Sequence, residues 1–151
     1  MPLIIAVLDT NVLVSALCLP DSLPADLLRR WLARQFVLLL SEQILAELLN
    51  VLGRPKIVRR FALTEQQALM FVQVLRDIAV ITSGELIVEA VPRDSKDNMV
   101  VACALEGEAG YIVSGDNHLK EMKEYHGVRI VSPAVFQSLL VQIGTASTST
   151  E

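Results

Sequence analysis

Two continuous apolar runs constrain the fold of this chain more than any other feature of its sequence. Residues 3–8 read LIIAVL and residues 36–40 read FVLLL, with no polar residue in either run. A strand that is apolar on both faces is typical of a parallel sheet with helices on both sides. The 52% content of hydrophobic residues and the mean hydropathy of +0.48 agree with such a buried sheet.

Capping residues, helix breakers and apolar spacing predict helices between the strands. Pro24 suits the first turn of one helix, Ser41 caps another that Gly53 ends, and the residues TEQQ from Thr64 form a capping box. We expect further strands at residues 80–82, 87–89, 111–113 and 128–131, and helices at residues 12–17, 24–34, 42–52, 56–61, 65–77, 97–108 and from 133 onward. This alternation predicts an α/β fold, a three-layer α/β/α sandwich with a central, mostly parallel sheet.

The length of 151 residues suits one domain. We expect residues 1–143 to form it and the closing residues 144–151, GTASTSTE, to be a disordered low-complexity tail. Neither apolar run is long enough to span a bilayer, and no basic stretch precedes the first run as in a signal peptide. Cys18 and Cys103 lie outside any Cys-x-x-Cys pair, which indicates a reducing compartment. We therefore expect a cytoplasmic protein without membrane contact, in which both cysteines pack as small hydrophobic residues.

The charge balance argues against one class of partner. The chain has 13 Lys and Arg residues against 17 Asp and Glu residues, a formal net charge of −4. A protein that holds duplex DNA by a broad basic face carries the opposite balance.

Four acidic residues fall where α/β proteins bind ligands, beyond the carboxyl ends of strands. Asp9 directly follows the first apolar run, and Asp116 follows the strand expected at residues 111–113. Asp97 lies in the first turn of its helix, on the face that carries buried residues, and Glu47 lies at the edge of an apolar stripe. Each has a simpler explanation alone: Asp9 is a helix cap, Asp116 starts a turn, Asp97 complements the helix dipole and Glu47 is solvated.

The segments around these acids resemble the four motifs of PIN-domain ribonucleases, in order and over nearly the whole chain. They are residues 8–13 (LDTNVL), residues 41–48 with Glu47, residues 97–104 (DNMVVACA) and residues 112–116 (IVSGD). The chain is most similar to the small prokaryotic single-domain members that are described as toxins of toxin–antitoxin pairs. One departure is His118, which stands where the fourth motif of the family often carries a second acid.

The resemblance implies a metal-dependent ribonuclease that hydrolyses RNA phosphodiester bonds. Asp9, Glu47, Asp97 and Asp116 are the implied catalytic metal ligands. Carboxylates crowded in this way need cations, and hard oxygen ligands suit Mg²⁺ or Mn²⁺. Thr10, Asn11 and Ser114 would orient water or phosphate next to the ligands, and turn and capping chemistry explains these three residues equally well.

The substrate phosphates would be held by basic residues outside the acids. The candidates for RNA contacts are Arg54, Lys56, Arg59, Arg60 and Lys120. Arg29, Arg30, Arg34 and Lys123 are further cations, and a solvated face explains each group as well. Without the four proposed ligands, 13 acidic residues balance 13 basic ones, so the acidity of the chain does not exclude RNA. We expect single-stranded RNA as substrate, an antitoxin protein as partner and a homodimer.

Other functions fit the sequence less well. A phosphoaspartyl hydrolase or a receiver domain would need a further acid near Asp9, and Asn11 stands where the hydrolase would carry its second acid. Neither G-x-S-x-G nor G-x-G-x-x-G occurs in the chain. The alternative that stays open is a catalytically inactive PIN-like scaffold that binds RNA or a partner protein.

Overall fold

The computed structural model describes residues 3–88 and 95–149 of the chain, and a sheet with strand order β3-β2-β1-β4-β6-β5 lies at their centre. The strands are β1 (Ile5–Leu8), β2 (Val37–Leu40), β3 (Val80–Ile81), β4 (Tyr111–Val113), β5 (Glu124–Tyr125) and β6 (Val128–Val131). The helices are α1 (Thr10–Cys18), α2 (Leu23–Leu32), α3 (Glu42–Leu52), α4 (Pro55–Phe61), α5 (Glu65–Ile78), α6 (Ser95–Glu106), α7 (Asn117–Met122) and α8 (Pro133–Ser149).

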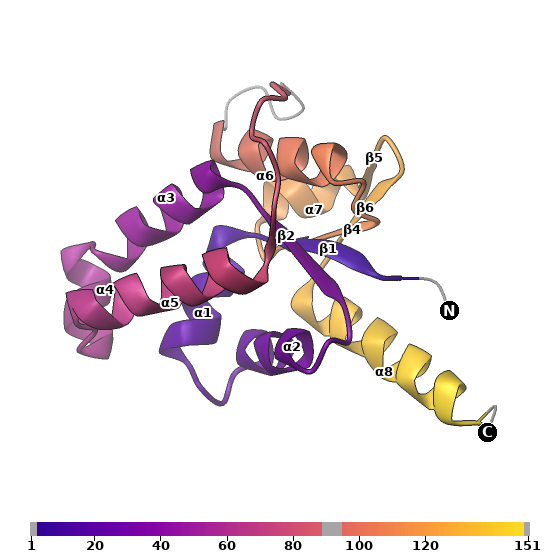
Figure 1. Cartoon of the computed structure of the whole chain (residues 1–151), viewed down its shortest axis with the longest axis horizontal. Helices are drawn as coiled ribbons and strands as arrows, with labels where there is room; N and C mark the ends of the chain where they lie inside the picture. Colours follow the sequence, from indigo (N-terminus) through magenta and orange to yellow (C-terminus); the bar gives the residue numbers. More distant parts are fainter. Residues whose placement is uncertain (1–2, 89–94, 150–151) are drawn as a thin grey trace.

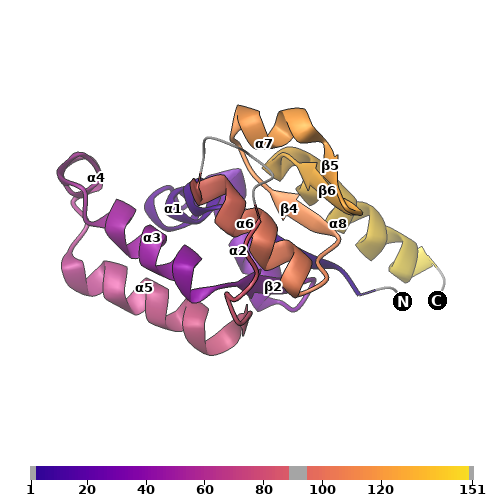
Figure 2. The same cartoon turned by 90° about the horizontal axis from the view of Figure 1, so that it is seen from above.

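Helices cover both faces of this sheet. Figures 1 and 2 show α6 and α7 on one side of the strands and α2 and α8 on the other. All neighbouring strands pair in parallel except β5 and β6, which are antiparallel. The predicted three-layer α/β/α sandwich with a mostly parallel sheet is therefore confirmed.

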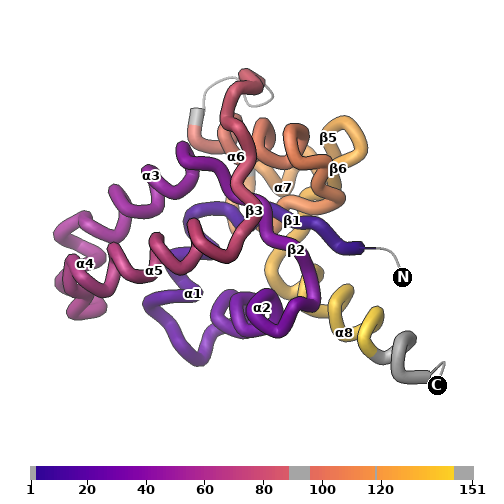
Figure 3. The backbone as a smooth tube through the Cα atoms, viewed as in Figure 1, coloured from indigo at the N-terminus to yellow at the C-terminus, as the bar shows by residue number. Residues whose placement is uncertain are grey.

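The first apolar run forms the central strand of the sheet. In β1, Ala6, Val7 and Leu8 have no exposed surface, as the absence of alternation predicts. The sheet continues from β1 to β2 and then β3 on one side, whereas β4 and β6 lie on the other side. In Figure 3, β1, β2 and β3 are labelled close together at the centre of the molecule. The direction of strand addition therefore reverses between β1 and β4. In open α/β sheets, such a reversal opens a crevice at the carboxyl ends of the two strands, where ligands bind.

Helix α8 is tied to the sheet and to α2. Phe136 is fully buried and packs edge-on against Phe36, with ring centroids 5.0 Å apart. Asp26 of α2 accepts hydrogen bonds from Gln137 Nε2 (2.9 Å) and Arg30 Nε (2.7 Å), which hold the pKa of its carboxyl below the ordinary value. The helix continues to Ser149, so the backbone is helical over most of the segment that its composition predicts to be disordered. The division of the chain at residues 143 and 144 stays a prediction.

Two short elements and one strand differ from the sequence prediction. Residues 87 and 88 form no strand, and Glu89 lies outside the described residues. The unpredicted α7 follows Asp116, whose Oδ1 accepts a hydrogen bond from the Leu119 N–H at 3.3 Å. The unpredicted β5 pairs with β6 across His126 and Gly127, which both have positive φ angles (48° and 85°). A two-residue turn of this kind matches the twist of a hairpin and favours glycine at its second position.

The two cysteines differ in burial. Cys103 is buried as predicted, and burial raises the pKa of its thiol to about 11. Cys18 is only partly buried.

Over residues 3–88 and 95–149, no single helix is long and apolar enough to cross a membrane. Only α1 and α2 taken together are long and apolar enough, and this pair is bent by 93°.

The capping box at the start of α5 gives a direct test of local stability. The Thr64 hydroxyl accepts a hydrogen bond from the Gln67 N–H at 3.1 Å, and Gln67 Oε1 accepts one from the Thr64 N–H at 2.9 Å. Thr64→Ala should lower the free energy of unfolding by about 1 kcal/mol, because one amide of the first turn loses its partner. Thr64→Asn keeps an acceptor and should cost much less, and equal losses in urea unfolding would contradict this assignment.

Candidate active site at the carboxyl ends of β1 and β4

All four acids singled out in the sequence line one cavity of about 190 Å³. Its lining residues are Asp9, Thr10, Asn11, Glu47, Val51, Arg54, Lys96, Asp97 and Asp116. They come from the end of β1, from α1, α3 and α6, and from the segments before α4 and α7. We call this space the acidic cavity, and it lies at the point where the order of strand addition reverses.

Asp9 is held firmly at the end of β1. It is only 7% exposed, and its N–H donates to the Val113 carbonyl of β4 at 3.0 Å. Its Oδ1 accepts the Thr10 N–H at 2.7 Å, and its Oδ2 accepts the Ser114 hydroxyl at 2.8 Å. These bonds fix the direction in which the carboxylate faces the cavity. Asp9 thus both caps α1 and lines the candidate site, so the capping explanation and the functional one hold together.

Ser114 links two of the acids. Its side chain is fully buried, and while its hydroxyl donates to Asp9, its Oγ accepts the Asp116 N–H at 2.9 Å. Asp116 in turn begins α7 through its contact with the Leu119 N–H. The order of residues in the segment after β4 therefore sets the relative positions of Asp9 and Asp116.

Asp97 and Glu47 reach the cavity from helices. Asp97 lies in the first turn of α6, which packs across β1, β2 and β4, and is 4% exposed. The side chain of Glu47 in α3 is 14% exposed, so Glu47 is not a solvated surface residue. Its Oε1 lies 3.0 Å from Lys96 Nζ and 3.7 Å from Arg54 Nη2. The cavity therefore combines four carboxylates with two cations.

The donor set of the cavity fits a hard divalent cation. Oxygen ligands from several carboxylates suit Mg²⁺ or Mn²⁺, and the lining contains neither cysteine nor histidine, which zinc prefers. Within the described part of the chain, no group of three or more His, Cys, Asp or Glu side chains is arranged to hold a metal ion. The metal-ligand role of the four acids stays a prediction.

The other predicted residues lie in different surroundings. Asn11 is exposed at the cavity and Thr10 is buried beside it. Asp94, an acid three residues before Asp97, and the side chain of His118 lie outside the described part of the structure. Glu42 lies in the first turn of α3 and accepts two hydrogen bonds from Arg76 at 2.9 and 3.1 Å.

The predicted RNA-binding cations divide into two groups. Arg54 lines the acidic cavity, whereas Lys56, Arg59 and Arg60 are exposed on α4 and are not among its lining residues. Lys120, on α7, is partly buried, and Arg29 and Arg30 pair with Asp26 in their own helix. Lys96 was not predicted from the sequence to lie at the site. Its signal was a lysine in the first turn of a helix, directly before a candidate ligand, where the helix dipole disfavours a positive charge.

Comparisons with known proteins agree with this geometry. A family model described as PIN domain matches residues 6–118, which include all four acids. The chain belongs to the PIN-domain family. PIN domains are generally nucleases, and PIN nucleases generally use divalent metals. Among curated proteins, no sequence matches the chain.

This PIN domain is also similar to a solved structure. The match is to a chain of the crystal structure of VapBC2 from Rickettsia felis bound to a DNA fragment from their promoter. It covers 85% of this chain and 98% of that chain, with 18% sequence identity and a TM-score of 0.57. At this level of identity the similarity establishes a shared fold.

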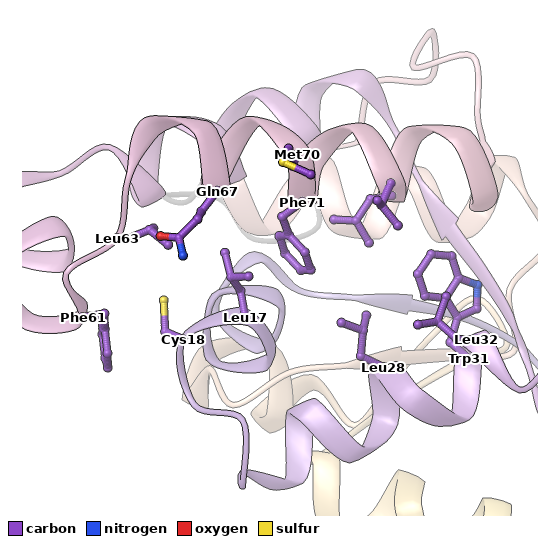
Figure 4. Close-up of a pocket in the computed structure, with 12 residues that line it drawn as sticks. Leu17, Cys18, Leu28, Trp31, Leu32, Phe61, Leu63, Gln67, Met70 and Phe71 are labelled. Atoms are coloured by element: carbon purple, nitrogen blue, oxygen red, sulfur yellow. The ribbon is translucent and has the colours of Figure 1, made fainter.

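A second cavity has the opposite chemical character. It measures about 470 Å³ and lies between α5 on one side and α1 and α2 on the other (Figure 4). Leu17, Leu28, Trp31, Phe61 and Phe71 are among its mostly apolar lining residues. Trp31 is 5% exposed and belongs to the core. This apolar cavity contributes no residue to the acidic cavity.

Proposed function

We propose that this PIN-domain protein is a metal-dependent ribonuclease that hydrolyses phosphodiester bonds of single-stranded RNA. The observation that carries the proposal is the convergence of Asp9, Glu47, Asp97 and Asp116, which are separated by up to 107 residues in the sequence, on one cavity at the strand-order reversal. Two of these carboxylates are more than nine-tenths buried. Burial of charge is costly without compensation, which a divalent cation supplies.

The acids have distinct tasks in this proposal. Asp9, Asp97 and Asp116 would hold Mg²⁺ or Mn²⁺, with Glu47 as the fourth acid of the site. When bound, such an ion supplies the positive charge that activates water and stabilises the leaving oxygen of a phosphodiester. Ser114 keeps the Asp9 carboxylate in one orientation through its 2.8 Å hydrogen bond. The exposed Asn11 side chain lies beside the cavity, where it would contact the substrate.

The basic residues would bind the strand outside the cavity. Arg54 lies at the cavity itself, and Lys56, Arg59 and Arg60 follow it along the exposed surface of α4. Together with Lys120, these residues would contact backbone phosphates, which makes binding dependent on salt. The low aromatic content of 5% favours phosphate contacts over a base-stacking platform.

We also propose that the protein acts in the cytoplasm as the toxin of a toxin–antitoxin pair. The support is the similarity to a chain of VapBC2, a toxin–antitoxin complex that is bound to promoter DNA in its crystal structure. The corresponding partner here would be a DNA-binding antitoxin. The homodimer remains part of this proposal.

Metal removal tests the enzymatic proposal. The purified protein should cleave single-stranded RNA with Mg²⁺ or Mn²⁺, EDTA should stop the reaction, and excess Mn²⁺ should restore it, because the acids need a cation to activate water. Cleavage followed by gel electrophoresis gives the measurement. Cleavage that continues in EDTA would contradict a metal-dependent reaction.

Calorimetry separates the enzyme from the inactive scaffold. A nuclease should release or absorb heat on titration with Mn²⁺, and this heat should fall in the Asp97→Asn variant. A protein that binds RNA, shows no heat with metal and leaves RNA intact would be the scaffold instead.

A further inference from the structure

We propose that Lys96 and Arg54 form a phosphate subsite at the edge of the acidic cavity, where they receive a backbone phosphate of the RNA strand. This inference rests on the proposed function and adds Lys96 as a substrate-binding residue. It follows from the way in which Glu47 holds the two cations, from their exposure and from their positions in the helices.

A single carboxylate oxygen brings the two cations together. Lys96 Nζ lies 3.0 Å and Arg54 Nη2 lies 3.7 Å from Glu47 Oε1, so these two nitrogens are at most 6.7 Å apart. Charge-assisted hydrogen bonds to phosphate are about 2.8 Å long. If two such bonds meet on one phosphate oxygen, their donor nitrogens lie up to about 5.6 Å apart. Bonds to two oxygens of one phosphate allow a larger distance between the nitrogens. The pair thus has the spacing to bind one phosphate together.

The ion-paired group and the aspartates of the cavity differ in charge. Glu47 with its two cations has a formal charge of +1, while Asp9, Asp97 and Asp116, which line the same cavity, are negative. A phosphate is repelled by the aspartates and attracted to the pair. This arrangement would place the anionic backbone at one edge and leave the aspartates for a divalent cation.

Glu47 and its two cations differ in their exposure to solvent. The Glu47 side chain is 14% exposed, whereas those of Lys96 and Arg54 are 55% and 48% exposed. A largely covered carboxylate therefore holds two cations that still face solvent. An ammonium group has three N–H donors and a guanidinium has five, so each group can bind a phosphate oxygen and Glu47 at the same time.

Both cations also occupy positions that helix energetics disfavour. Lys96 lies in the first turn of α6, at the positive end of the helix dipole. Arg54 is the N-cap residue of α4 and makes no side-chain capping bond, because a guanidinium accepts no hydrogen bond. Neither side chain has an acceptor atom for the amides of the first helical turn. A role at the cavity that both side chains line explains why they stand there.

Salt-dependent RNA binding tests the subsite without cleavage. Binding of a fluorescently labelled single-stranded RNA would be measured by anisotropy in EDTA over a range of salt concentrations. Lys96→Met should raise the Kd about threefold to tenfold at low salt and reduce the slope of log K against log salt by about 0.7, the value for one lost contact to a single strand. Arg54→Met should do the same, and Lys96→Arg should keep the slope.

Arg129→Met is the matched control. Arg129 is exposed and does not line the acidic cavity, so its loss should leave the slope unchanged. An unchanged slope for Lys96→Met, or a slope that Lys96→Arg also loses, would overturn the subsite. If Lys96→Met unfolds, as circular dichroism would show, the Arg54→Met and Lys96→Arg variants decide the question by the same slopes.

The two proposals fail in different ways. Metal-dependent cleavage by the wild type, with normal RNA binding by Lys96→Met and Arg54→Met, would remove the subsite and leave the nuclease. Loss of binding in both variants of a protein that never cleaves RNA would keep the subsite and remove the nuclease.

Discussion

Asp9→Asn is expected to abolish RNA cleavage and to leave the fold intact. The substitution keeps the size of the side chain but removes the charge of an acid that two hydrogen bonds hold in the cavity. Loss of a group that merely orients a metal ligand typically costs about 10–100-fold in affinity or activity. Loss of a ligand charge should therefore reduce kcat by more than about 100-fold. Initial rates of cleavage under saturating RNA give the measurement.

The same variant should remain folded, because asparagine caps helices as well as aspartate does. We expect its Tm to change by less than about 4 °C, which corresponds to about 1 kcal/mol in a chain of this size. Asp21→Asn makes the same chemical change at an exposed residue outside the cavity and should keep full activity. Undiminished cleavage by Asp9→Asn would refute the assignment of the site.

Phe136→Ala should produce the largest loss of stability among single changes to α8. The Phe136 ring has no exposed surface, contacts Phe36 edge-on and lies 5.7 Å from the Tyr111 ring. Truncation of a buried phenylalanine removes its apolar contacts and leaves a cavity, which costs about 3–5 kcal/mol. The loss of two ring contacts places the expected value in the upper half of this range. Urea unfolding followed by circular dichroism gives the free energy.

The neighbouring residue gives the control. Val135 lies in the same turn of α8 but is 52% exposed, so Val135→Ala should change the free energy of unfolding by less than about 0.5 kcal/mol. A loss below about 1 kcal/mol for Phe136→Ala would mean that α8 contributes little to the core, contrary to its contacts with β4 and α2.

The sequence predicts the larger elements because burial and capping leave clear local patterns. The unbroken apolar runs become β1 and β2, and Ser41 and Thr64 cap α3 and α5 as expected. The elements that were missed, α7 and β5, have six and two residues, too few for a period to be visible. The polar tail was expected to be disordered from its composition, yet the preceding apolar helix α8 continues into it.

The candidate site could be predicted in part for a different reason. Asp9 and Asp116 stand at strand ends, and the ends of parallel strands meet at one edge of the sheet, so their proximity follows from the topology. The sequence alone explains Glu47 as a solvated residue, because Glu47 lies at the edge of the apolar stripe of α3. In the structure it pairs with Lys96, which is 49 positions away in sequence and comes from another helix. No pattern among neighbouring residues of the sequence indicates a contact between such distant positions.

The two outer strands of the sheet, β3 and β5, are only two residues long. A strand at the edge of a sheet exposes unpaired backbone N–H and C=O groups with which a strand of another chain can pair, and short edge strands expose few of them. This sheet therefore offers few backbone groups for pairing with a strand of a second copy. Two copies of the protein would associate through the side chains of their helices and not by joining their sheets into one.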